Sequence, residues 1–125
     1  MHKKVKIGLV LAGGIAKGAY QVGVLKAFTE RLPKDFFDYI STSSVGCLNG
    51  YTYSQGQLEE CKGVWEKINF KGALSFAHEF YETDFIDRMF RPFEGISAPL
   101  EQNFYISCFS LPDKHLRYVN MKNVP

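Results

Sequence analysis

Two serines stand where a short β-branched run meets a predicted helix. Residues Tyr39–Thr42 favour a strand, and the residues from Val45 onward favour a helix. A serine at such a turn has its Oγ pushed out of the backbone, and the N–H groups of the new helix face whatever that Oγ attacks. Gly46 follows Ser44 by two positions and supplies the small residue that close strand–helix contact requires. Ser44 is therefore a candidate nucleophile, and its neighbour Ser43 forms part of the turn.

A glycine-rich loop precedes the first predicted helix. Gly13, Gly14 and Gly18 lie in it, and Ala19 follows where a phosphate-binding P-loop would have lysine. The glycine spacing also differs from the dinucleotide-binding fingerprint. The remaining possibility is an oxyanion hole, in which backbone N–H groups bind the negative oxygen of a tetrahedral intermediate. Each such donor typically lowers the activation barrier by ~3–4 kcal/mol. The alternative is a tight turn whose glycines serve close packing alone.

The elements around both loops follow an α/β pattern. Strands are expected at residues 5–11 and 36–42, helices at 19–32, 45–54 and 58–68, and a hairpin of two strands at 103–109 and 116–120. Alternation of buried strands with helices predicts a mostly parallel sheet with right-handed crossovers. Both loops then lie at the carboxyl ends of strands, where open α/β sheets bind ligands. One domain spanning residues 1–125 is expected, with helices on both faces of the sheet.

Residues 70–100 have a weaker pattern, with aromatic side chains scattered among charges. This pattern favours short helices that cover the edge of the sheet. A second interpretation is an apolar cover over a lipid-binding pocket.

Composition narrows the function classes. The chain has 125 residues, 46% of them hydrophobic, and a net charge of +2, which is too small to indicate a nucleic-acid partner. Three cysteines without a C-x-x-C pair indicate a reducing compartment and argue against a zinc site. No histidine has a metal-ligand neighbour at helical spacing, so no metal or cofactor is expected. The basic and apolar N-terminus resembles a short signal peptide, but Lys6 interrupts the apolar run and favours a buried first strand.

Taken together, the two loops resemble those of the patatin-like phospholipases, a family of serine lipid acyl hydrolases. The family's first strand leads into a Gly-Gly-Gly-x-[Arg/Lys]-Gly loop and a helix, and this chain has LAGGIAKGAYQVGVLKAF at residues 11–28. The family's second landmark is Gly-Thr-Ser-x-Gly-Ala-Leu-Asn, and this chain has TSSVGCLN at residues 42–49. The resemblance covers about residues 7–51. It implies a three-layer α/β/α fold, of which the chain is expected to form the N-terminal, incomplete portion.

The resemblance also implies roles for individual residues. Ser44 would be the nucleophile. The oxyanion hole would be formed by Gly13, Gly14 and Ile15, with Lys17, Gly18 and Gly46 in support. The family's general base is an aspartate in a later Asp-Gly motif.

The sequence departs from the family pattern at three points. Ile15 stands in place of the third glycine of the loop, and Thr42 stands in place of the first glycine of the elbow. None of the five aspartates is followed by glycine. The pair most similar to the family's Asp-Gly motif is Glu94–Gly95. A serine hydroxyl is a poor nucleophile without a base within hydrogen-bond reach.

Three hypotheses follow. The first is a lipid acyl hydrolase whose nucleophile is Ser44, with half of the catalytic dyad in this chain. The second is a triad of Ser44, Asp84 or Asp87, and His115, in the order found in α/β-hydrolases. The third is a non-catalytic lipid- or acyl-binding module of the same fold. The first is favoured, with a lipid or acyl-ester substrate, no nucleic acid, and a cytoplasmic location with peripheral contact to a membrane.

Overall fold

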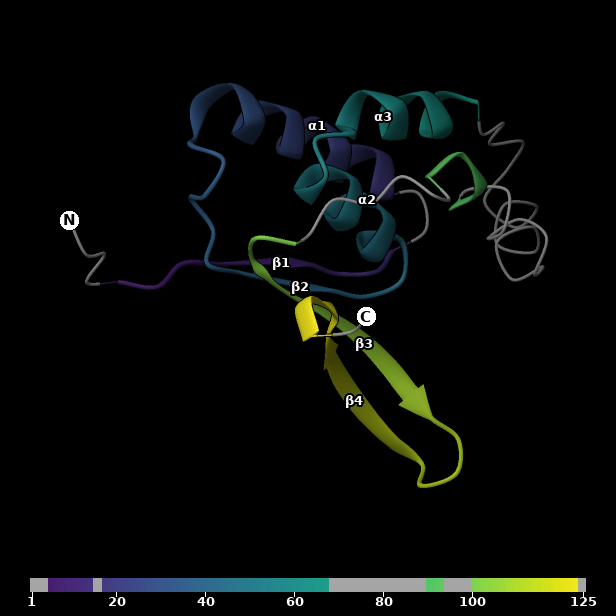
Figure 1. The fold of residues 1–125 in the computed structure, drawn as a ribbon. Helices are drawn as coiled ribbons and strands as arrows, with labels where there is room; N and C mark the ends of the chain where they lie inside the picture. The colour runs from purple at the N-terminus through teal and green to yellow at the C-terminus, as the bar shows by residue number, and fades with distance from the viewer. Residues whose placement is uncertain (1–4, 15–16, 68–89, 94–99, 124–125) are drawn as a thin grey trace.

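The chain folds around a four-stranded sheet (Figure 1). The computed structural model describes residues 5–14, 17–67, 90–93 and 100–123. The elements in chain order are β1 (Gly8–Leu11), α1 (Lys17–Arg31), β2 (Tyr39–Thr42), α2 (Val45–Ser54), α3 (Leu58–Glu66), the short helix η1 (Arg91–Phe93), β3 (Asn103–Ser110), β4 (His115–Asn120) and the short helix η2 (Met121–Asn123).

The strands are arranged in the order β1-β2-β3-β4, with the first three parallel and β4 antiparallel to β3. The register aligns Leu9 with Ile40 and Ile40 with Phe104, so these apolar side chains share one face of the sheet. Parallel neighbours cannot be joined by a tight hairpin. Helix α1 accordingly provides the crossover from β1 to β2.

The core lies between this face and the helices. Ile40, Leu25 and Cys61 are fully buried, and Phe104 and Leu48 are nearly so. Helix α2 lies between the sheet and the other two helices, which explains why most of its residues are buried (Figure 1). The position of Ser44 is therefore determined by a helix that is packed on several sides.

The predicted α/β fold with a mostly parallel sheet is confirmed. Helices α1, α2 and α3 lie on one face of the sheet (Figure 1), and in the part of the chain that the structure describes no α-helix covers the other face, where Val10 is 74% exposed. The helices expected on this second face stay a prediction.

The predicted elements correspond closely to the observed ones. Helix α2 begins and ends where the sequence indicated, and the predicted hairpin is the antiparallel pair of β3 and β4. The first two strands are shorter than expected, since their opening residues run outside the ladder. Most of the segment 70–100, including Asp84, Asp87 and Glu94, lies outside the described residues. Among the helices that are described, none is long and apolar enough to cross a bilayer.

Candidate active site

Ser44 occupies a strained turn between β2 and α2. Its backbone has φ 52° and ψ −127°, a region that non-glycine residues rarely adopt and that costs on the order of 1–3 kcal/mol. The side chain is exposed, and α2 begins at the next residue, Val45. The first N–H groups of a helix have no partner within it, and they carry partial positive charge. The geometry therefore places an exposed hydroxyl at the positively charged N-terminal end of a helix.

The glycine loop after β1 lies directly against this turn. Because β1 and β2 are parallel neighbours, their carboxyl ends meet at the same edge of the sheet. The N–H of Gly13 donates to Ser43 Oγ at 3.0 Å, and the N–H of Ser43 donates to the carbonyl of Leu11 at 3.1 Å. A Cβ added to Gly13 would lie 2.9 Å from Ser44 Cβ. The loop and the serine turn are thus in direct contact at the carboxyl ends of their strands, where the sequence placed both loops.

Gly46 lets helix α2 approach the end of β1. A Cβ at this position would overlap the carbonyl group of Leu11, a backbone atom that cannot swing away. The first turn of the helix is tight, since the Gly46 N–H donates to Ser43 O at 3.0 Å and the Cys47 N–H donates to Ser44 O at 2.9 Å. The small residue expected after the candidate nucleophile is therefore required by helix–strand contact.

Thr42 is accommodated where glycine is usual in the resemblance. Its side chain is almost fully buried, and its hydroxyl donates to the carbonyl of Tyr105 at 2.9 Å on the neighbouring strand. Space for its methyl group is provided by Gly50, where an added Cβ would lie 2.8 Å from Thr42 Cγ2. The extra bulk of Thr42 is thus offset by Gly50, which lies about one turn beyond Gly46 in α2.

The other predicted site residues fall around the loop. Gly14 has φ 148°, which favours glycine, and the side-chain stem of Lys17 lies against it. The Lys17 N–H donates to the Gly14 carbonyl at 2.7 Å as α1 begins. Gly18 is buried, and a Cβ there would overlap the ring of Trp65. Ile15 lies outside the described residues.

His115 lies away from the serine turn. It is exposed and pairs with Ser110 at the tip of the β3–β4 hairpin, whereas Thr42, two residues before Ser44, pairs with Ile106. Four further residues along a strand span about 13 Å. Across the described residues, no hydrogen bond joins Ser44 Oγ to a carboxylate or an imidazole, and no three potential metal ligands cluster.

Cysteine reactivity provides a direct check on the packing beside the serine turn. Burial raises the pKa of the Cys47 thiol, and hydrogen bonds, including one with Thr42, lower it by a smaller amount. Burial also raises the pKa of the Cys61 thiol. A raised pKa leaves less thiolate at pH 8. Iodoacetamide at that pH should therefore modify exposed Cys108 first and fully buried Cys61 last, as followed by peptide mass mapping. Faster modification of Cys61 than of Cys108 would contradict the packing.

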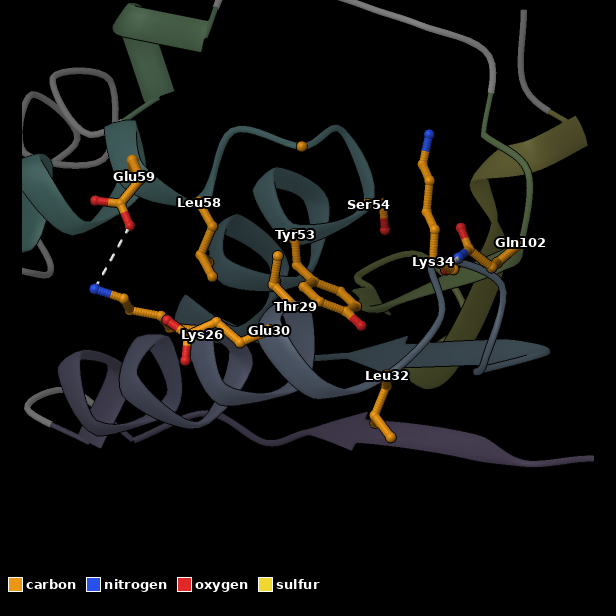
Figure 2. A pocket seen from close by; sticks show the side chains of 11 residues that line it. Lys26, Thr29, Glu30, Leu32, Lys34, Tyr53, Ser54, Leu58, Glu59 and Gln102 are labelled. Carbon is orange, nitrogen blue, oxygen red and sulfur yellow. Dashed lines mark hydrogen bonds and ion pairs between the residues drawn. The ribbon is translucent and has the colours of Figure 1, made fainter.

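A cavity lies beside the C-terminal end of α2, where Tyr53 and Ser54 line it (Figure 2). Its volume is about 380 Å³, and its apolar wall includes Leu32, Leu58 and the ring of Tyr53. An ion pair between Lys26 Nζ and Glu59 Oε1, 3.8 Å apart, spans part of its rim (Figure 2). Tyr53 belongs to the last turn of α2 and Ser44 precedes its first, so the length of the helix, roughly 15 Å, separates the cavity from the serine turn.

Three polar side chains near the loop were missed by the sequence analysis as site residues. Gln21, Asn49 and Trp65 form hydrogen bonds that reach the glycine loop, although they are far apart in the chain. The sequence held one indication of this network, because Asn49 is a polar residue within the largely apolar predicted helix 45–54.

The fold and the site define an α/β protein with a serine elbow beside a glycine-rich loop. The model of the patatin-like phospholipase family matches residues 9–115 of the chain. The chain therefore belongs to the patatin-like phospholipase family. A comparison with curated proteins gives no match.

Proposed function

We propose that the chain supplies the nucleophile and the oxyanion-binding half of a lipid acyl hydrolase. The observation that carries this proposal is the left-handed backbone of exposed Ser44 at the start of α2, in contact with the Gly13 loop. Backbone strain in a non-glycine residue persists only where the surrounding structure holds it, and it concentrates at functional sites. Membership of a family of lipid acyl hydrolases supports an ester substrate.

In the proposed reaction, Ser44 Oγ attacks the carbonyl carbon of a lipid ester. The hydroxyl proton passes to a base, and the carbonyl oxygen becomes an oxyanion in the tetrahedral intermediate. Collapse of the intermediate breaks the ester bond, releases the alcohol part of the lipid after protonation, and leaves the acyl group on Ser44. Water then hydrolyses this acyl-enzyme to a fatty acid and regenerates the serine.

The oxyanion is proposed to bind to N–H groups of the loop after β1. Gly13 donates its N–H to Ser43 Oγ at 3.0 Å, so its direct role requires that this hydrogen bond be exchanged for one to substrate. The N–H groups of Gly14 and Ile15 are the other proposed donors. Lys17, at the positively charged end of α1, adds electrostatic support.

The general base is the part of the dyad for which the chain has no matching motif. The family resemblance implies an aspartate followed by glycine, and this pair does not occur in the sequence. The proposal therefore concerns the serine and its oxyanion donors, and we expect weak turnover by these 125 residues alone.

A fluorophosphonate probe tests this proposal. The probe forms a covalent bond with an activated serine Oγ and expels fluoride, so intact mass should show one adduct, and peptide mapping should place it on Ser44. Circular dichroism confirms that the sample is folded. Absence of an adduct on folded protein, or an adduct on a different serine, would overturn the assignment of the nucleophile.

The second candidate function is binding of an acyl group without catalysis. The apolar cavity bordered by Leu32, Tyr53 and Leu58 is the observation that favours it, since about 380 Å³ falls within the range of small-molecule sites. A binding module should take up a fluorescent fatty acid equally well with and without Ser44. Only a hydrolase should lose its probe reaction when that serine is replaced.

A further inference from the structure

The peptide group between Ala12 and Gly13 is held at both of its polar ends. Gln21 Nε2 donates to the Ala12 carbonyl at 2.6 Å, and the Gly13 N–H donates to Ser43 Oγ at 3.0 Å. The two bonds come from different elements, α1 and the turn after β2. A peptide plane held in this way resists rotation, and it restrains the start of the next peptide group, Gly13–Gly14, which carries the Gly14 N–H.

Gln21 is itself held by a buried asparagine. Asn49 Nδ2 donates to Gln21 Oε1 at 3.0 Å and to the Gly18 carbonyl at 2.9 Å. Asn49 Oδ1 accepts from Trp65 Nε1 at 2.8 Å and from Cys61 Sγ at 3.3 Å. The side chain of Asn49 is fully buried and has a partner for each of its donors and for both acceptor positions.

The direction of these hydrogen bonds follows from the chemistry of the indole. Trp65 Nε1–H can only donate, so the atom of Asn49 that faces it must be the amide oxygen. The amide nitrogen of Asn49 then faces Gln21, which must accept with Oε1 and donate with Nε2. Three successive donations therefore run from Trp65 on α3 to the carbonyl of Ala12, and each bond polarises the next.

We propose that Trp65, Asn49 and Gln21 are positioning residues that orient the Gly13–Gly14 peptide for oxyanion binding. This inference rests on the proposed function, because it assigns a task to the loop that the proposed reaction uses. A purely structural role would be satisfied by the bonds that join the three helices. It would not require the last bond, which leaves the helices and ends on the loop.

The half-buried side chain of Gln21 makes this last bond testable. Gln21→Met keeps the length of the side chain and removes both polar ends. We expect the first-order rate of fluorophosphonate labelling at saturating probe to fall about 10- to 100-fold, because small displacements of catalytic groups cost up to about 100-fold in rate. The probe concentration at half-maximal rate should change less than threefold, since the loop acts on the reacting oxygen and not on the acyl chain.

A matched control lies in the same helix as Asn49. Thr52 is fully buried, and its hydroxyl donates to the carbonyls of Leu48 and Asn49 within α2. It also forms a hydrogen bond with the Cys61 thiol, and none of these partners belongs to the glycine loop. Thr52→Val removes a buried hydrogen bond without touching the loop. Its labelling rate should stay within twofold of wild type even though its thermal stability falls.

A second readout does not depend on activity. In ¹⁵N-labelled protein, Gln21→Met should shift the amide resonances of Gly13 and Gly14 and speed hydrogen exchange at Gly13, whereas Thr52→Val should leave both unchanged. A wild-type labelling rate in Gln21→Met overturns the proposal whatever the spectra show. If wild-type protein is not labelled at all, the proposed function fails, and unchanged Gly13 and Gly14 resonances in Gln21→Met would then overturn the positioning role on their own.

Discussion

Replacing Ser44 by alanine is expected to lower fluorophosphonate labelling and ester hydrolysis by about three orders of magnitude or more. The variant lacks the Oγ that is proposed to carry the acyl group, and removal of a serine nucleophile commonly costs that much or more in rate. Alanine keeps a Cβ, so the unusual backbone of residue 44, with φ 52°, should persist and the fold should remain. The measurements are intact mass after labelling and the rate of p-nitrophenyl butyrate hydrolysis. Retained labelling in Ser44→Ala would eliminate this serine as the nucleophile.

Ser44→Gly separates the strain at this turn from its chemistry. Glycine adopts positive φ without steric cost, so the strain at residue 44 should be relieved while activity is still lost. Urea unfolding should show a free energy of unfolding about 1 kcal/mol above that of Ser44→Ala. Equal stability of the two variants would show that the turn is unstrained.

Replacing Gly46 by alanine is expected to have the largest effect on stability. The added Cβ would overlap the Leu11 carbonyl, so α2 must move away from β1 and the turn at Ser44 must shift with it. Overpacking against backbone costs typically 1–3 kcal/mol and occasionally more, which is a large fraction of the total for a small domain. The measurement is the urea midpoint by circular dichroism, with loss of labelling as a second sign.

Gly23→Ala is the matched control for this change. Gly23 lies inside α1, and no neighbouring atom lies within 4 Å of an added Cβ. The same substitution should there raise the free energy of unfolding by about 0.5–1 kcal/mol, because alanine favours a helix interior. A Gly46→Ala protein as stable as wild type would contradict the close contact between α2 and β1.

The local elements of this fold were predictable from the sequence because their signals lie close together in the chain. The short β-branched run at residues 39–42, followed by the helical run from Val45, was sufficient to predict the turn at Ser44. The glycine loop after β1 was predictable in the same way. That the two loops meet followed from a general property of parallel strands.

The chain segment around Asp84 and Asp87 lies outside the described residues, and the predicted cover formed by residues 70–100 stays a prediction for the same reason. His115 was open to a catalytic interpretation because sequence order alone does not give distance. β3 continues for four residues beyond its last pair with β2, from Ile106 to Ser110, and His115 pairs with Ser110. The distance of His115 from the serine turn depends on this extension.

The sequence by itself determined the order of strands and helices, the two loops and the serine between them, because propensity, glycine content and hydrophobic period are local properties. Only the tertiary structure decided which distant side chains meet. Asn49 and Trp65 are 16 positions apart, and Gln21 and Asn49 are 28 apart, yet their amide and indole groups share one buried network. Hydrogen bonds of this kind have no sequence period, because they depend on how α1, α2 and α3 pack together. The same packing decides that Thr42 is tolerated, since Gly50 approaches it from α2.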